Sequence, residues 1–207
     1  MSYRFRKDQG FSILEMLISL SIITMILTVI VRGQSNFSES AGLQNAADQI
    51  ALYFSQVQTF SLGVKEVTPG VFSSSFGMAF STRAMPNGST TAYIYFADRD
   101  NDSLFDNDWN CVTGGTSECL ERPFLYRGNT ISNLCIVPSS GADLCGQGRI
   151  DISFYRPRAE ARFLFFDSGG NQVTPPVGYQ GAKITLRSPS GTLRSISVYT
   201  TGQISVQ

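Results

Sequence analysis

An apolar run near the N-terminus is the feature that most constrains how this chain folds. Residues Phe11–Val31 read FSILEMLISLSIITMILTVIV, twenty-one positions in which Glu15 is the only ionisable side chain. As an α-helix this run is about 30 Å long, the thickness of a bilayer's hydrocarbon core. Arg4, Arg6 and Lys7 precede it, and basic residues of this kind stay on the cytoplasmic side. We therefore expect a transmembrane segment at residues 11–31, with the rest of the chain on the extracytoplasmic side.

The length of the apolar run and the presence of Glu15 argue against two simpler interpretations of this segment. An ordinary secretory signal has an apolar region of about 7–15 residues that ends at a small-residue cleavage site. The run here is longer and ends in Val31-Arg32-Gly33-Gln34. A plain signal anchor explains the hydropathy but leaves Glu15 unexplained. A carboxylate costs a few kcal/mol at the bilayer centre, so ionisable residues within membrane helices usually have a function.

The residues Lys7–Glu15, KDQGFSILE, resemble the class III leader of type IV pilins and pseudopilins. The resemblance implies that residues 1–10 are a leader, that a prepilin peptidase cuts between Gly10 and Phe11, and that Phe11 is then N-methylated. It also implies that Glu15, the fifth residue of the mature chain, pairs with the terminal amine of a neighbouring subunit. Only a close partner offsets the desolvation of charges in hydrocarbon, so Glu15 would favour correct assembly. The implied partners are other pilin or pseudopilin subunits, the prepilin peptidase and the inner membrane.

The remainder of the chain has two patterns. Residues 32–63 continue the helix in amphipathic form, with an apolar stripe at Leu43, Ala46, Ala47, Ile50, Tyr53, Phe54, Val57 and Phe60. Residues 64–207 contain short β-like runs between turn residues: 71–72, 77–81, 91–97, 150–156, 162–166, 182–187 and 195–200. The expected fold class is α+β, a long N-terminal helix packed on an antiparallel β-sheet head, as in pilins.

Turns and later motifs narrow the resemblance. Ser168–Asn171 and Ser188–Gly191 supply residues that suit hairpin turns. Tyr95–Asp102 resembles an acidic hairpin of H-type minor pseudopilins of type II secretion and of T- or U-type minor pilins. The ending, Leu193–Ile204, is similar to their final hairpin, in which a Thr-Gly pair makes the turn. Gln203 stands where that group leads us to expect arginine.

The four cysteines, Cys111, Cys119, Cys135 and Cys145, all follow the apolar run. The chain has no histidine, so a zinc site would need all four thiolates. An even number of cysteines in an extracytoplasmic domain indicates two disulfides. Three connectivities are possible, and we favour 111–119 with 135–145 because each closes a short Gly-rich loop.

An aspartate-rich loop is a candidate calcium site. Asp98, Asp100 and Asp102 match positions one, three and five of an EF-hand loop, and Asp106 matches position nine. Position six is Ser103 and position twelve is Trp109, so the match fails there, although Asp108 could substitute. The alternative is a hairpin whose carboxylates point to water.

Charge and composition bound the function. The chain carries sixteen basic and sixteen acidic residues, so no global charge favours a nucleic-acid partner. Without histidine the commonest general base is missing, and we expect no enzymatic activity.

The expected function is a minor pilin or pseudopilin subunit of a type II secretion pseudopilus or type IV pilus. The alternatives are a pilus-tip module that binds DNA or a surface, and a membrane-anchored calcium-binding domain that does not polymerise. The DNA alternative requires clustering of the basic residues Arg149, Arg156, Arg158, Arg162, Lys183, Arg187 and Arg194.

Overall fold

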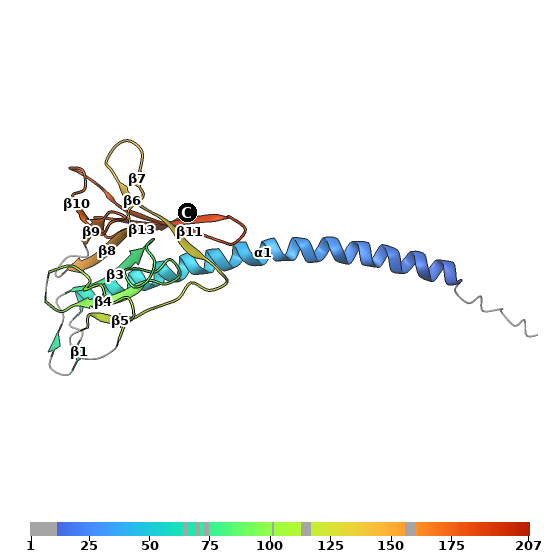
Figure 1. The fold of residues 1–207 in the computed structure, drawn as a ribbon, viewed down its shortest axis with the longest axis horizontal. Helices are drawn as coiled ribbons and strands as arrows, with labels where there is room; N and C mark the ends of the chain where they lie inside the picture. The colour runs from blue at the N-terminus through green and yellow to red at the C-terminus, as the bar shows by residue number, and fades with distance from the viewer. Residues whose placement is uncertain are drawn as a thin grey trace, which may run out of the picture. The chain divides into compact units, whose positions relative to one another are not determined.

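The computed structural model describes residues 12–63, 66–68, 71–72, 75–100, 102–112, 117–155 and 160–207, without the side chains of 32–37, 66–68 and 71–72. In these parts of the chain one helix, α1 (Ile13–Leu62), is followed by thirteen strands (Figure 1). The chain divides into two compact units, Met1–Ser38 and Glu39–Gln207, and each is described by itself below.

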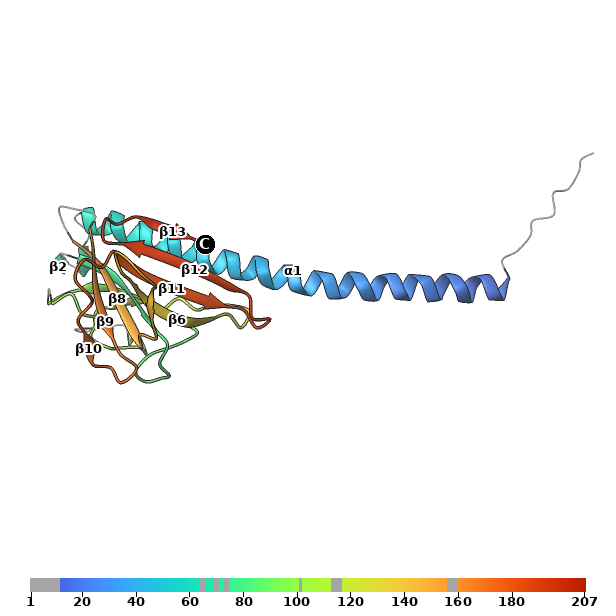
Figure 2. The same cartoon turned by 90° about the horizontal axis from the view of Figure 1, so that it is seen from above.

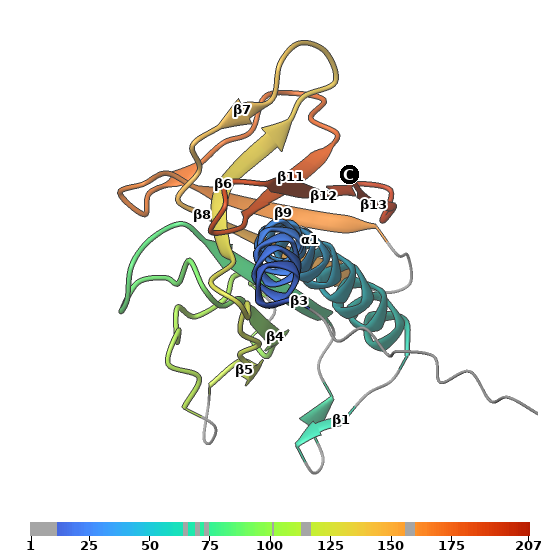
Figure 3. The same cartoon turned by 90° about the vertical axis from the view of Figure 1, so that its right-hand side faces the viewer.

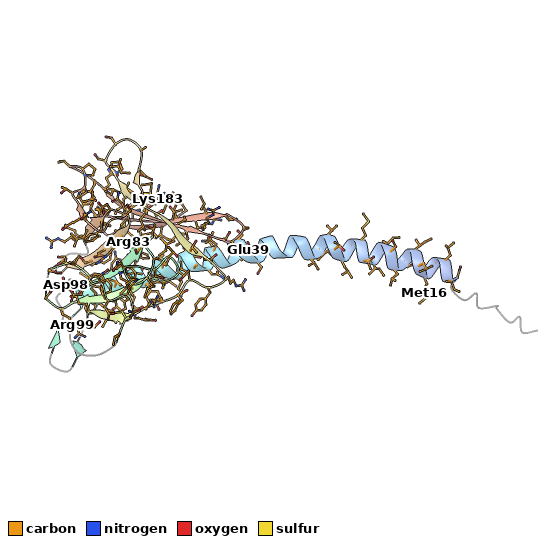
Figure 4. All side chains as sticks on the ribbon, viewed as in Figure 1. Met16, Glu39, Arg83, Asp98, Arg99 and Lys183 are labelled. Atoms are coloured by element: carbon orange, nitrogen blue, oxygen red, sulfur yellow. A yellow bond between two sulfur atoms is a disulfide. The ribbon has the colours of Figure 1, made fainter. Side chains whose placement is uncertain are left out.

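The first unit contains the apolar part of α1. Ile13–Val31 has a mean hydropathy of 2.4 and no buried residue, so it is long and apolar enough to cross a membrane. Its large side chains, such as Met16, project outward from the helix (Figure 4). The hydroxyl groups of Ser19 and Thr28 donate to carbonyl oxygens one turn earlier, both at 2.8 Å. These bonds satisfy the polar side chains inside the helix, which suits a hydrocarbon environment.

The second unit begins with the amphipathic part of α1, and the predicted stripe is confirmed. Leu43, Ala47, Ile50, Phe54 and Val57 are fully buried, and the stripe's other members are buried or pack against the same core. The helix ends where the Gly63 amide donates to the carbonyl of Thr59 at 3.0 Å.

Two antiparallel sheets complete the head, beside a small pair formed by β1 (Glu66–Thr68) and β2 (Val71–Phe72). The larger sheet has the order β10 (Gln172–Val173), β9 (Ala161–Phe166), β8 (Arg149–Tyr155), β3 (Ser75–Ser81), β4 (Ile94–Asp98), β5 (Cys119–Glu121). The other has the order β13 (Ile204–Val206), β12 (Leu193–Tyr199), β11 (Gly181–Arg187), β6 (Thr130–Val137), β7 (Leu144–Cys145). Figure 2 shows β12 and β13 beside the C-terminal half of α1, where Gln58 Nε2 donates to the carbonyl of Gly202.

Aromatic contacts join α1 to the larger sheet. The Phe54 ring lies 5.7 Å from that of Phe80 on β3 and 6.4 Å from that of Phe154 on β8. Ile184 and Ile196 of the five-stranded sheet belong to the same buried cluster, and Figure 3 shows α1 lying against strands of both sheets. The main core is therefore shared by the helix and both sheets.

A second core lies on the other face of β3 and β4. Ile94 and Phe96 of β4 point into it, and the alternate residues Tyr95 and Ala97 point into the main core. The strand alternates its side chains between two buried layers, as the period of two requires. Phe105, Trp109 and Cys119 complete this second core, so the acidic loop is anchored from beneath by apolar side chains.

The structure contains each predicted strand, all but β2 with an end shifted by one to three residues, and several strands that were not predicted. The largest difference at a predicted strand is β4, which begins at Ile94 and not at residue 91, because the backbone there pairs with the loop after β5. The predicted turns connect β9 to β10 and β11 to β12, with Gly170 at φ 91° and Gly191 at φ 90°. The strands that were not predicted are β1, β5, β6, β7 and β10. β13 is the last strand of the final hairpin that the resemblance implied.

We predict that Phe54→Ala destabilises the head by about 3–5 kcal/mol, because it removes a ring packed in the shared core. Urea unfolding of the detergent-solubilised protein, followed by Trp109 fluorescence, measures the change. Leu52→Ala is the matched control, since Leu52 is two positions away on the same helix and 70 % exposed. It should shift the free energy of unfolding by less than about 0.5 kcal/mol. Equal effects of the two substitutions would contradict the packing described here.

Candidate functional site

The candidate assembly site lies at the start of α1. Ser12 precedes the helix and its hydroxyl accepts a hydrogen bond from the Leu14 amide at 3.3 Å. Glu15 follows in the first turn, surrounded by exposed apolar side chains such as Ile13 and Met16. Within the described part of the chain its carboxylate has no hydrogen-bond or ion-pair partner. The predicted cleavage and methylation residues, Gly10 and Phe11, lie outside the described residues.

Comparison with known proteins bears on this segment. Residues 5–31 match the family described as the prokaryotic N-terminal methylation motif. The match includes Gly10, Phe11 and Glu15 and ends where the apolar run ends. No curated protein and no solved structure matches the chain.

The motif and the fold together define a class. An N-terminal methylation motif on an apolar helix, followed by antiparallel sheets, is the arrangement of a type IV pilin-like protein. The match supports a membrane-anchored subunit that is processed by a prepilin peptidase and assembles with other pilin subunits.

Both favoured disulfides are present, Cys111–Cys119 and Cys135–Cys145. The first joins the acidic loop to the start of β5, and the second links directly opposed residues of β6 and β7. Cys111 has φ 53°.

The acidic loop brings together a set of carboxylates different from the predicted set. One carboxylate oxygen from each of Asp98, Asp100 and Glu118 lies within 4.8 Å of the others. Asp98 is fully buried at the end of β4, and its Oδ2 accepts hydrogen bonds from Ser75 Oγ at 2.7 Å and the Ser103 amide at 3.1 Å. Ser103 adopts φ 73°, so the loop makes its turn at position six without glycine.

Glu118 is the member that the sequence analysis missed, because it comes sixteen residues after Asp102 and precedes a different strand. Its carboxylate is buried and accepts hydrogen bonds from the amides of Arg99 at 2.8 Å and Asp106 at 3.2 Å. Burial raises the pKa of Glu118 to about 7, against the lowering effect of the Arg99 amide.

The other predicted calcium ligands have different roles. Asp102 is exposed and caps the amide of Leu104 at 2.7 Å. Asp106 is exposed as well. Asp108 Oδ2 accepts from the Val112 amide at 3.0 Å and from Ser117 Oγ at 2.9 Å, so it braces the first disulfide loop. The structure groups neither Asp102, Asp106 nor Asp108 with the carboxylate cluster.

The basic residues that the DNA alternative requires do not form one exposed set. Arg149 is buried and ion-paired with Asp151. Arg162 lies over the Tyr155 ring at 5.1 Å, and Lys183 is ion-paired with Asp143. Arg156 and Arg158 lie outside the described residues. The remaining two, Arg187 and Arg194, are on neighbouring strands β11 and β12.

Calcium binding remains a prediction, now placed on Asp98, Asp100 and Glu118. We expect calcium to raise the melting temperature of the full-length protein, by mass action equivalent to about 2.7 kcal/mol at a hundredfold excess over Kd. Calcium competes with a proton at Glu118, so the response should be larger at pH 8 than at pH 5.5. Without calcium, the stability of the fold depends on pH in the opposite direction. The raised pKa of Glu118 stabilises the fold at low pH, and this contribution is lost as the pH rises through about 7.

The matched variants for this test are Asp100→Asn and Asp102→Asn. Asp100→Asn should abolish the calcium response, whereas Asp102→Asn should keep it, because the Leu104 amide can still bond to the amide oxygen. If calcium does not change the melting temperature at pH 8, the loop is a solvated hairpin.

Proposed function

We propose that this protein is a minor, non-enzymatic subunit of a type II secretion pseudopilus or a type IV pilus. The observation that carries the proposal is the position of Glu15, inside a methylation motif and at the start of an exposed apolar helix. An assembly role gives both the carboxylate and the apolar surface a partner.

The physical argument starts from what Ile13–Val31 exposes. Its residues leave apolar surface uncovered on every side of the helix, which is stable only in lipid or against other helices. In a filament, the equivalent helices of neighbouring subunits supply that cover. The charge of Glu15 then requires a cation at the same depth, because an unpaired carboxylate in hydrocarbon is strongly disfavoured. The methylated terminal amine of a neighbour meets this requirement.

The head supports assignment to the minor H-type, T-type or U-type subunits. Its chain ends in a β12–β13 hairpin in which Gly202 adopts φ 85° and the Tyr199 amide bonds to the carbonyl of Gln203. Its aspartate-rich segment follows β4 directly. Both features match the motifs through which the sequence resembles that group. A filament subunit also requires no catalytic centre, consistent with a chain that lacks histidine.

Processing provides the first test. Intact-mass analysis of membrane-extracted protein should show a chain that starts at N-methylated Phe11. Gly10→Glu should leave the leader attached, since a large charged side chain replaces the smallest residue at the predicted scissile bond. A mature wild-type protein that retains Met1–Gly10 would support the non-polymerising anchored domain instead.

Assembly provides the second test. Glu15→Ala should leave membrane insertion and leader cleavage intact but strongly reduce incorporation into filaments. A neighbour's amine then lacks its partner, a loss of about 3–5 kcal/mol for a buried pair. Immunoblots of sheared filaments against membranes measure the distribution. Thr28→Ala, in the same apolar helix, is the control and should assemble normally. Normal assembly of Glu15→Ala would remove the carboxylate from the proposed mechanism.

A further inference from the structure

A pocket at one end of the six-stranded sheet has no part in filament assembly as proposed above. Its volume is about 270 Å³. It lies where β3, β8 and β9 are neighbours, since Ser81 pairs with Arg149 and Arg149 pairs with Phe166 in the strand register. Its lining residues are Arg83, Leu104, Phe105, Asp106, Asn107, Arg149, Phe166 and Gly170.

Arg149 is a fixed structural element of this pocket. It forms a two-pronged ion pair with Asp151, in which Nε donates to Oδ1 at 2.7 Å and Nη2 bonds to Oδ2. Its guanidinium lies 4.8 Å from the centre of the Phe166 ring and 5.4 Å from that of Phe105. Asp151 neutralises its charge, so Arg149 positions its neighbours and does not supply a free cation.

Arg83 is different, because its side chain makes no hydrogen bond or ion pair with any residue that the structure describes. It is half-buried (labelled in Figure 4). Its guanidinium packs against Gly170, where an added Cβ would lie 2.5 Å from Nη1. The glycine thus allows the close approach, and the guanidinium is held at the pocket with its donors unused.

Asn107 adds a second donor. Its Oδ1 already accepts hydrogen bonds from Trp109 Nε1 at 2.8 Å and from Arg149 Nη1 at 3.2 Å. The side-chain amide is therefore fixed in orientation, and its Nδ2 hydrogens have no acceptor in the described part of the chain. Asp106 is the one acidic lining residue.

We propose that this pocket binds a carboxylate group, with Arg83 as the charged donor and Asn107 as the neutral one. The planar guanidinium fork matches a carboxylate in two parallel hydrogen bonds. The negative charge of Asp106 disfavours a doubly charged phosphate more than a singly charged carboxylate. The pocket volume suits a small organic acid or the C-terminal end of a peptide, and these two sources share the same recognised group.

Trp109 gives this proposal a direct readout, because it is the only tryptophan in the chain and its indole N–H is bonded to Asn107. The full-length protein in detergent micelles is titrated with acetate, diglycine, diglycine amide and phosphate at constant ionic strength. Tryptophan fluorescence and the indole N–H signal in NMR report binding. Acetate and diglycine should give saturable changes, whereas diglycine amide, which lacks the carboxylate, and phosphate should not. Tighter binding of diglycine than of acetate identifies a peptide end as the source, and equal binding identifies a small acid.

Three variants decide whether Arg83 is responsible. Arg83→Gln should weaken carboxylate binding at least about tenfold, and Arg83→Lys should weaken it less, because the charge stays and the fork is lost. Arg187→Gln removes an exposed arginine of β11 outside the pocket and should bind as the wild type does. The melting temperature of each variant verifies that the head is folded. The proposal is overturned if carboxylates give no saturable response, or if folded Arg83→Gln responds as the wild type does.

Discussion

The head depends on one packing arrangement, in which a single stripe of α1 fills the space between two sheets. Phe54 contacts rings from β3 and β8, and the same buried cluster includes side chains of β6, β11 and β12. Without the helix, the apolar inner face of each sheet would be exposed to water. The helix supplies the apolar surface against which both faces pack. The same helix is apolar on all sides from Ile13 to Val31. One continuous element therefore serves two environments, and its sequence changes from uniformly apolar to amphipathic accordingly.

Buried charges organise the loops around this core. Asp98, Glu118 and Asp151 are each almost inaccessible to water. Their oxygens accept bonds from backbone amides of the 99–106 segment. Each of these hydrogen bonds offsets part of the cost of burying a carboxylate. This explains why an irregular loop with many aspartates keeps a defined path over the second core.

The sequence predicted those features that depend on local pattern. The apolar run, the stripe from Leu43 to Phe60 and the glycine turns follow from periodicity and backbone preference. Most strands with continuous apolar character were recognised for the same reason. β6 was missed because its residues, TISNLCIV, mix polar with apolar side chains and include Cys135, which was expected in a disulfide-closed loop. Its pairing with β11 is long-range and leaves no local signal. Glu118 and the Arg83 pocket were missed for the same reason, since each joins segments that only the sheet order brings together.

The disulfide between β6 and β7 affects how an edge of the sheet can contact neighbouring chains. β7 is the outermost strand of its sheet and has only two residues, Leu144 and Cys145, both exposed. An outermost strand offers unpaired backbone groups to any neighbouring chain, and natural proteins limit this by keeping such strands short. Here the strand is also tied covalently to its partner at Cys135. At this edge of the five-stranded sheet, the short strand and its disulfide therefore leave little unpaired backbone for a neighbouring chain to bind.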